Sequence, residues 1–212
     1  AQPADQACRR AMLTAPRDPV LLHLAAMAAL QCGNASRARS LLQRCLAKDP
    51  SYGPAHQDLG NWHLRRSEYE QARAAYERAL ANGRSSAALL TNLGVVCCRQ
   101  GDQDRGTAWL SAALQRDPSY AEAWANLAVV HQKSGRSDQA LVHFRTALTH
   151  DPDSIVANRG LAALFAELGR HADALSLYRR LATELAPSDR SALQAYRHYA
   201  RRACMWQEVS RV

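Results

Sequence analysis

The chain has 212 residues, of which 47% are hydrophobic and 22% are charged, so its apolar share suffices for a folded core. Two Phe, ten Gly and eight Pro, together with few β-branched residues, argue against an all-β fold, a collagen-like chain and a disordered chain. No uncharged apolar run approaches the roughly 18 residues of a membrane span. The composition therefore predicts a soluble, all-helical protein without a membrane partner.

The formal net charge is +8, and arginine supplies nearly all of it because Lys48 and Lys133 are the only lysines. A basic surplus can indicate nucleic acid or an acidic membrane surface as a partner. The arginines are spread along the chain, with one concentration near its end at Arg190, Arg197, Arg201, Arg202 and Arg211. Since they form no continuous basic stripe, the sequence disfavours a nucleic-acid partner.

The six cysteines form neither a C-x-x-C pair nor the spacing of a disulfide framework. Several lie where small apolar side chains are expected, as buried thiols do. This usage favours a reducing compartment, and we expect a cytoplasmic location. A periplasmic or secreted location stays open, because Ala1–Pro3 would also fit the residues after a cleaved signal.

Landmark residues recur along the chain at one fixed spacing. A leucine followed by a small residue occurs at Leu59-Gly60, Leu93-Gly94, Leu127-Ala128 and Leu161-Ala162. The same spacing separates Ala72, Gly106, Ala140 and Ala174, and likewise Tyr76, Leu110, Phe144 and Tyr178. Because a shared period of about 34 residues is the signature of a helical repeat protein, we expect each unit to form one pair of helices.

Taken in chain order, the period predicts a truncated unit, a series of full units and a partial one. Residues 1–18 correspond to the second helix of a truncated repeat, and the full repeats are 19–52 (atypical), 53–86, 87–120, 121–154 and 155–188. The Asp18-Pro19 stop lies three residues too close to repeat 19–52, so we expect its first helix to begin early or to be shortened. Residues 189–212 form a partial repeat or C-terminal helices, with a first helix over 189–204 and another beginning within 205–212. Because both ends fall inside repeats, we expect the chain to be a piece of a longer protein.

The unit 121–154 shows how one repeat is built. Trp124, Leu127, Ala128 and His131 follow the i, i+3, i+4, i+7 stripe of an amphipathic helix, which Gly135 ends. The second helix carries Ala140, Phe144, Ala147 and Leu148 and stops at Asp151-Pro152. The small residue after each landmark leucine is expected where two helices pack closely, because a larger side chain would separate them.

These residues match the pattern W-x-x-L-G-x-x-Y…A-x-x-x-F…P, with Ala128 in place of Gly and His131 in place of Tyr. The chain resembles tetratricopeptide-repeat (TPR) proteins over nearly its whole length. This resemblance implies a right-handed α-solenoid of helix-turn-helix repeats. It also implies a non-catalytic scaffold that binds an extended protein segment in its concave groove.

No motif for catalysis is visible. The sequence contains no phosphate-binding glycine loop, no G-x-S-x-G elbow and no H-E-x-x-H helix. His56 and His63 lie seven residues apart on one helix face, but zinc would require two further ligands. Because His63 and His131 occupy the core tyrosine position of the repeat, packing explains them better. We therefore expect no catalytic residue, no metal and no cofactor, although a parent chain could be an enzyme.

The first helices present two rows of polar residues that would line the groove. The position before each landmark leucine holds Asp58, Asn92, Asn126 and Gly160, and a second row holds Arg65, Arg99, Lys133 and Glu167. Amides could hold the backbone of an extended peptide, and cations could meet its acidic groups. Alternatively, Asn is simply common at its position, and the cations cap helix ends favourably. The candidate groove comprises Asp58, Asn61, Arg65, Asn92, Val95, Arg99, Asn126, Val129 and Lys133.

Two further alternatives follow from the sequence. The asparagine row and the stretch Arg201-Arg202-Ala203-Cys204-Met205-Trp206 resemble the repeat arm of O-linked N-acetylglucosamine transferases, although Met205 replaces a more usual acidic residue. That resemblance implies an arm that presents substrates to a catalytic domain outside this sequence. End-to-end self-assembly through exposed end helices is the other alternative. A carboxylate clamp of the chaperone type is excluded, because Glu122 stands where that clamp carries a cation.

Overall fold

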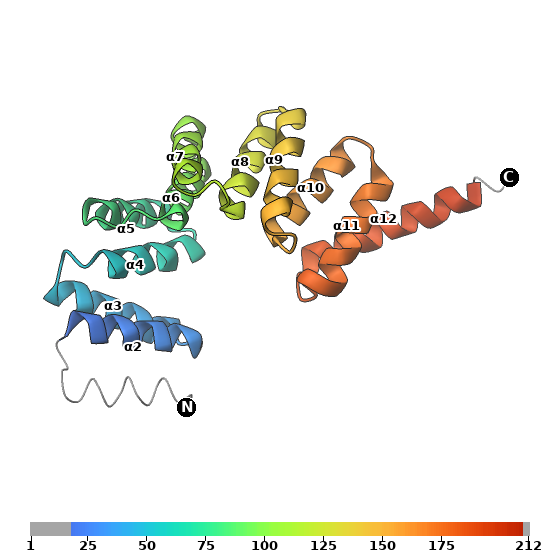
Figure 1. Cartoon of the computed structure of the whole chain (residues 1–212). Helices are drawn as coiled ribbons and strands as arrows, with labels where there is room; N and C mark the ends of the chain where they lie inside the picture. Colours follow the sequence, from blue (N-terminus) through green and yellow to red (C-terminus); the bar gives the residue numbers. More distant parts are fainter. Residues whose placement is uncertain (1–17, 210–212) are drawn as a thin grey trace. The chain divides into compact units, whose positions relative to one another are not determined.

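The computed structural model describes residues 18–209, and the side chains of this part as far as Arg202. Every regular element in this part is a helix (Figure 1), and within each compact unit helices that are neighbours in sequence pack against one another. The predicted all-α, TPR-type solenoid class is thereby confirmed. The second helix expected within residues 1–18 lies outside the described residues.

The helices alternate between the first and second members of each repeat. The first helices are α2 (Pro19–Gln31), α4 (Gly53–Arg65), α6 (Ala87–Arg99), α8 (Ala121–Lys133) and α10 (Ile155–Glu167). The second helices are α3 (Ala35–Lys48), α5 (Tyr69–Ala81), α7 (Gln103–Arg116), α9 (Ser137–His150) and α11 (His171–Arg180). A π-helical turn, η1 (Leu181–Leu185), and α12 (Arg190–Val209) follow. Each of these first helices begins one sequence period after the preceding one, and so does each second helix.

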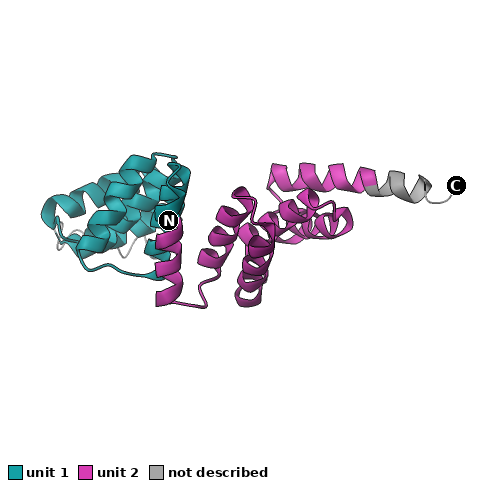
Figure 2. Cartoon of the chain, turned by 90° about the horizontal axis from the view of Figure 1, so that it is seen from above, with its two compact units in different colours: residues 1–106 teal, residues 107–212 magenta. Residues whose placement is uncertain are grey.

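The chain divides into two compact units, residues 1–106 and 107–212, with the division inside α7 (Figure 2). In unit 1, α2 packs on α3 and α4 packs on α5, while α3 contacts α4 and α5 contacts α6. In unit 2, α10 packs on α8, α9 and α11, and α12 packs on α11. Each unit therefore builds its own core from the apolar stripes of neighbouring helices.

The turn between the two helices of each repeat contains one residue in the left-handed conformation. These residues are Gly33, Ser67, Gly101, Gly135 and Gly169. Glycine adopts positive φ without steric cost, whereas a residue with a Cβ loses roughly 1–2 kcal/mol there. Ser67, at φ 59°, is the only described residue other than glycine with a positive φ. The turn of repeat 53–86 is therefore the strained one of the series.

A side-chain N–H at the fourth position of three first helices donates to a backbone carbonyl six residues earlier, in the preceding loop. The pairs are His56 Nε2 with Pro50 O (2.8 Å), Trp124 Nε1 with Pro118 O (2.8 Å) and Asn158 Nδ2 with Pro152 O (3.0 Å). In α6 the same position holds Leu90, which has no N–H in its side chain, and Arg84 replaces the proline. The His56 side chain therefore fixes the loop before α4, as Trp124 and Asn158 fix the loops before their helices.

The expected close contact at the small residues is present. A Cβ added to Gly60 would lie 2.5 Å from Cε1 of the fully buried Tyr76 ring. Real Cβ atoms do not approach so closely, so glycine is required for α4 to pack on α5. Ala128 and Ala162 are fully buried at the same position of their repeats.

Two expectations about helix ends are wrong. Helix α2 is neither early nor shortened, because Pro19 is its first residue and the helix is as long as α4. Proline suits this position because its missing N–H would have no intrahelical partner, and Asp18 caps Val20 N at 2.8 Å. Helix α12 runs unbroken from Arg190 to Val209, so no second helix begins within 205–209. This segment contains neither Gly nor Pro, and nothing local stops the helix.

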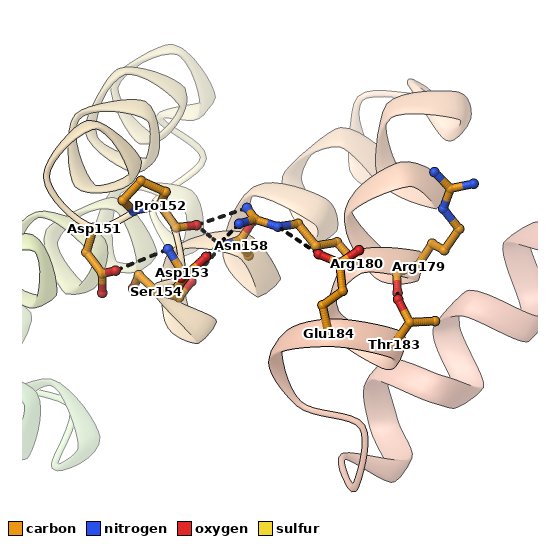
Figure 3. Close-up of polar contacts among 9 residues, drawn as sticks. All are labelled: Asp151, Pro152, Asp153, Ser154, Asn158, Arg179, Arg180, Thr183 and Glu184. Atoms are coloured by element: carbon orange, nitrogen blue, oxygen red, sulfur yellow. Dashed lines mark hydrogen bonds and ion pairs between the residues drawn. The ribbon is translucent and has the colours of Figure 1, made fainter.

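An arginine joins consecutive repeats in unit 2. Arg180 at the end of α11 reaches the loop between α9 and α10, where Nη1 donates to Pro152 O at 3.0 Å and Nη2 to Asp153 Oδ1 at 2.6 Å (Figure 3). The loop is therefore bonded both by its own repeat, through Asn158, and by α11. These contacts fix α10 and α11 relative to the preceding loop.

Candidate functional site

A pocket of about 220 Å³ lies on unit 1 among α2, α3 and α4. Its apolar lining is Met27, Leu30, Ala35, Leu42 and Trp62, and its polar lining is Asp58, Asn61, Arg65 and Arg66. Three residues of the predicted groove, Asp58, Asn61 and Arg65, are thus brought together in one pocket. They lie on one face of α4 because their spacings of three and four residues follow the helical turn.

Hydrogen bonds hold the polar side of this pocket in place. The His23 Nε2–H donates to Asp58 Oδ2 at 2.7 Å, and both side chains are more than four-fifths buried. Asn61 Oδ1 accepts from Tyr76 O–H at 2.8 Å and from Asn92 Nδ2 at 3.0 Å. Burial raises the pKa of Tyr76 well above its usual range, so its hydroxyl remains a donor. The polar groups are therefore pre-positioned by neighbours on three other helices.

Two guanidinium groups lie over the indole at the edge of the pocket. Arg39 and Arg66 are 4.6 Å and 4.8 Å from the ring centroid of Trp62. Each such cation–π contact contributes roughly 0.5–1 kcal/mol at an exposed site. Arg65 and Arg66 thus place guanidinium groups beside Asp58 and Asn61 on the polar side of the pocket, and Arg66 also pairs with Glu68 at 2.7 Å.

The remaining predicted residues lie outside this pocket. Val95 and Arg99 are on α6, where Val95 is partly buried and Arg99 is the exposed last residue of the helix. On unit 2, Asn126 donates to Glu122 O of its own helix at 2.8 Å, and Val129 packs against the core. Lys133 is the exposed last residue of α8.

The cationic row follows the ends of the first helices. Arg65, Arg99 and Lys133 are each the final residue of their helix, where a cation interacts favourably with the helix dipole. The helix dipole is therefore enough to explain cations at these three positions, without a bound ligand. Arg65 differs from the other two because it also lines the pocket of unit 1.

The asparagine row is interrupted at Gly160 for a steric reason. A Cβ at this residue would lie 2.2 Å from Cζ of Phe144, and that ring is fully buried. An asparagine would displace the ring from the core of unit 2. The missing amide is thus a consequence of packing between α9 and α10.

Sequence reasoning missed several residues of the pocket. Met27 and Leu30 come from α2, and Trp62 lies on α4 beside Asn61. His23 of α2 does not line the pocket but bonds to Asp58. The equivalents of Trp62 in later repeats are Val96, Val130 and Leu164, all of them buried aliphatic residues. Only this tryptophan could have indicated the pocket from the sequence, because its side chain is too large for the space that the buried aliphatic residues fill in the later repeats.

Two histidines form the main titratable cluster of unit 2. The rings of His131 (α8) and His143 (α9) have centroids 5.0 Å apart, and Trp124 lies 5.2 Å from His143. Burial lowers the pKa of both histidines, and their buried Nδ1 atoms have no hydrogen-bond partner in the described part of the chain. The pair thus packs as neutral rings, in agreement with the packing interpretation of His131.

The buried thiols are similarly unreactive. Cys45 Sγ donates to Pro19 O at 3.2 Å, and burial raises its pKa to about 11. Burial likewise raises the pKa of the Cys97 thiol. Over the described residues, no group of three or more His, Cys, Asp or Glu could hold a metal ion. No helix in this part of the chain is both long and apolar enough to cross a bilayer.

Solved structures with this fold include several TPR proteins. YrrB, described as a TPR protein with an unusual peptide-binding site, is 22% identical, with 92% of this chain and 100% of YrrB covered and a TM-score of 0.64. TTC0263, a TPR protein of Thermus thermophilus, is 20% identical over 86% of this chain and 98% of its own, with a TM-score of 0.72. A chain of the APC/C hetero-tetramer Cut9–Hcn1 is 17% identical over 93% of this chain and 46% of its own, with a TM-score of 0.57.

Family models give the same result. Residues 21–147 match the model of the middle TPR-like domain of cilia and flagella-associated protein 70, and residues 119–188 match a tetratricopeptide-repeat model. No curated protein matches the chain. The first model alone covers more than half of the residues of this chain. The chain therefore belongs to the tetratricopeptide-repeat family, whose folds serve as protein-interaction scaffolds.

Proposed function

We propose that this protein is a non-catalytic scaffold that binds an extended protein segment along its first helices, with the pocket of unit 1 as the anchor. The observation that carries the proposal is this pocket, which joins an apolar lining to pre-positioned polar groups. Its volume, about 220 Å³, is below the roughly 300 Å³ at which pockets for drug-sized molecules begin. It therefore suits one large side chain of a protein segment.

The apolar lining supplies the main binding energy. Met27, Leu30 and Leu42 form this surface beside Trp62. Burying a side chain the size of leucine or phenylalanine there contributes about 1.5–3 kcal/mol. A segment without a large apolar residue would lose this anchor.

The polar side suits the backbone of the same segment. An extended chain presents N–H and C=O groups that must be satisfied on binding. Asp58 is an acceptor for such N–H groups, and Arg65 is a donor two helical turns along the same face. The lining contains no Ser, Thr, Cys, Lys or His, and its one carboxylate, Asp58, is bonded to His23, so we assign binding and no reaction to this site.

The experiment selects peptides from a phage-displayed 12-residue library on the 212-residue chain and measures their affinities by fluorescence anisotropy. Met27→Arg places a charge in the pocket, and we expect the selected peptides to bind it at least 10-fold more weakly. Val142→Arg is the control, because Val142 is a 59% exposed apolar residue on α9 and the change adds the same charge. Equal affinity for both variants, each with wild-type circular dichroism, would refute the pocket as the anchor.

A second variant tests the amide row separately. Asn92→Ala/Asn126→Ala removes one side chain from each unit, and Asn92 is the one bonded to Asn61. Weaker binding of the selected peptides would support a role for these amides, by contact with the peptide backbone or, for Asn92, through its bond to Asn61 of the pocket. Unchanged affinity would leave the pocket as the anchor and exclude the amide row.

The two alternatives from the sequence stay hypotheses. None of the relatives reported above is described as a glycosyltransferase. The side chains of Ala203–Trp206, which carry most of that resemblance, lie outside the described residues. Light scattering over a range of concentrations tests the self-assembling solenoid, and the cytoplasmic location remains a proposal from cysteine usage.

A further inference from the structure

The groove-lining positions of the first helices recur on α12, where they are mainly basic. A hollow on this helix is lined by Arg190, Leu193, Gln194, Arg197, His198, Arg201 and Arg202. Four repeat periods separate this hollow from the pocket of unit 1. Gln194 corresponds to Asp58, Arg197 to Asn61, His198 to Trp62, Arg201 to Arg65 and Arg202 to Arg66. The α12 hollow is thus the same surface of the repeat with a different chemistry.

Three of its arginines form a line along the helix. Arg190, Arg197 and Arg201 are separated by seven and four residues, so they project from one face. The line is about 16 Å long at the 1.5 Å rise of an α-helix. Arg190, Arg197, Arg201 and Arg202 are all exposed. This concentration of charge therefore faces solvent.

No carboxylate among the described side chains neutralises these arginines. Asp189, the nearest in sequence, forms its ion pair with Arg159 of α10, and Glu184 pairs with Arg180. Four guanidinium groups within about three helical turns repel one another, since like charges on one helix face are destabilising. A ligand with several carboxylates would remove this repulsion and form charge-assisted hydrogen bonds, which can be bidentate with arginine.

The surroundings favour a short acidic stretch over a nucleic acid. The corresponding groove positions of α10 are Val156, Gly160, Ala163 and Glu167, so the basic surface does not continue onto it. Unit 2 also carries a hollow rich in carboxylates, whose acidic residues are Asp117, Glu122, Asp151 and Asp153. A long phosphate backbone needs an extended basic surface, which α10 does not provide.

We propose that the α12 hollow binds an acidic stretch of about five residues, rich in Asp and Glu, within the protein segment that this scaffold recognises. Five residues follow from the length of the arginine line and the roughly 3.3 Å rise of an extended chain. The inference rests on the proposed function, because it adds a specificity for acidic sequence to the same groove-lining surface. Arg197 and Arg201, in the centre of the line, make the principal contacts.

The test uses the 212-residue chain and a fluorescein-labelled peptide with five consecutive glutamates flanked by Gly-Ser. A peptide with five glutamines is the matched probe. We expect binding of the glutamate peptide only, with affinity at least 10-fold lower for Arg197→Gln/Arg201→Gln. The control variant is Arg145→Gln/Arg179→Gln, which removes two exposed arginines of second helices in the same unit and changes the net charge equally. It should retain affinity within two-fold.

Three outcomes would overturn the inference. These are equal losses in both double variants, equal binding of the glutamine peptide, and tighter binding of a 12-nucleotide oligo-dT that depends on the same two arginines. The library-selected peptides separate this inference from the proposed function. If their affinity depends on Met27 while the glutamate peptide does not bind, only the assignment of the α12 hollow fails. If Met27→Arg has no effect on them, the pocket of unit 1 fails independently.

Discussion

Replacing Arg180 with leucine removes the contacts that join α11 to the preceding loop. Arg180 donates to the Pro152 carbonyl and to Asp153, and Nη1 also lies 3.5 Å from Oδ1 of the fully buried Asn158 (Figure 3). Leucine keeps much of the aliphatic stem and loses every donor. The variant therefore tests the hydrogen bonds more than the packing.

The magnitude follows from the exposure of each partner. The ion pair contributes at most about 1 kcal/mol, because the Asp153 side chain is 74% exposed and water screens it. Loss of the bond to the Pro152 carbonyl costs roughly 1 kcal/mol, and leaving the buried Asn158 Oδ1 without its donor adds up to about 1 kcal/mol. We expect Arg180→Leu to lower the free energy of unfolding by about 1–3 kcal/mol. At this chain length each kcal/mol lowers Tm by roughly 2–4 °C.

Urea denaturation followed by circular dichroism measures this change. Arg179→Leu is the matched control, since Arg179 is exposed and its side chain points away from the loop in Figure 3. It should change stability by less than about 0.5 kcal/mol. A double-mutant cycle with Asp153→Asn should give a coupling energy below about 1 kcal/mol. Equal destabilisation by Arg180→Leu and Arg179→Leu would refute the assignment of these hydrogen bonds.

Three further predictions concern the turns, the asparagine row and pH. Ser67→Gly should stabilise the protein by up to about 1 kcal/mol, because relief of the strain at positive φ exceeds the entropy gained by the unfolded chain. Gly160→Asn should destabilise it by about 1–3 kcal/mol, because the new side chain displaces the ring of Phe144. Since burial lowers the pKa of His131 and His143 below 6.5, the folded state binds fewer protons than the unfolded state as pH falls through and below 6.5. Stability should thus be full above this pH and decrease below it, and His131→Phe/His143→Leu should reduce the decrease in urea titrations at different pH values.

Each of these predictions has an outcome that would contradict it. Gly101→Ser should destabilise its turn, just as Ser67→Gly should stabilise the equivalent one. A stabilising Gly101→Ser or a destabilising Ser67→Gly would contradict the role of positive φ. A Gly160→Asn variant as stable as the wild type would show that the Phe144 ring can move freely. An unchanged pH profile in the double histidine variant would assign the acid sensitivity to other groups.

The helices and their order could be predicted from the sequence because the signals are local. The repeat period, the glycine in four of the five described turns and the small residue at the close contact lie within one repeat and act on neighbouring turns of the chain. The core position of His131 follows from the same helical spacing. The start of α2 at Pro19 could have been predicted from the period itself, since it lies one period before Gly53.

Only the tertiary structure decided which side chains meet across repeats. The sequence places Asp58, Asn92, Asn126 and Gly160 at equivalent positions, yet each has a different environment. Asp58 accepts a hydrogen bond from His23 of α2, and Asn92 donates to Asn61. Asn126 donates to a carbonyl of its own helix, and Gly160 leaves room for the ring of Phe144. The period determines where a residue lies on its helix, whereas its partners depend on the size and rotamers of side chains from neighbouring helices. The pocket of unit 1 likewise required α2, α3 and α4 to be assembled, because no single repeat contains its lining.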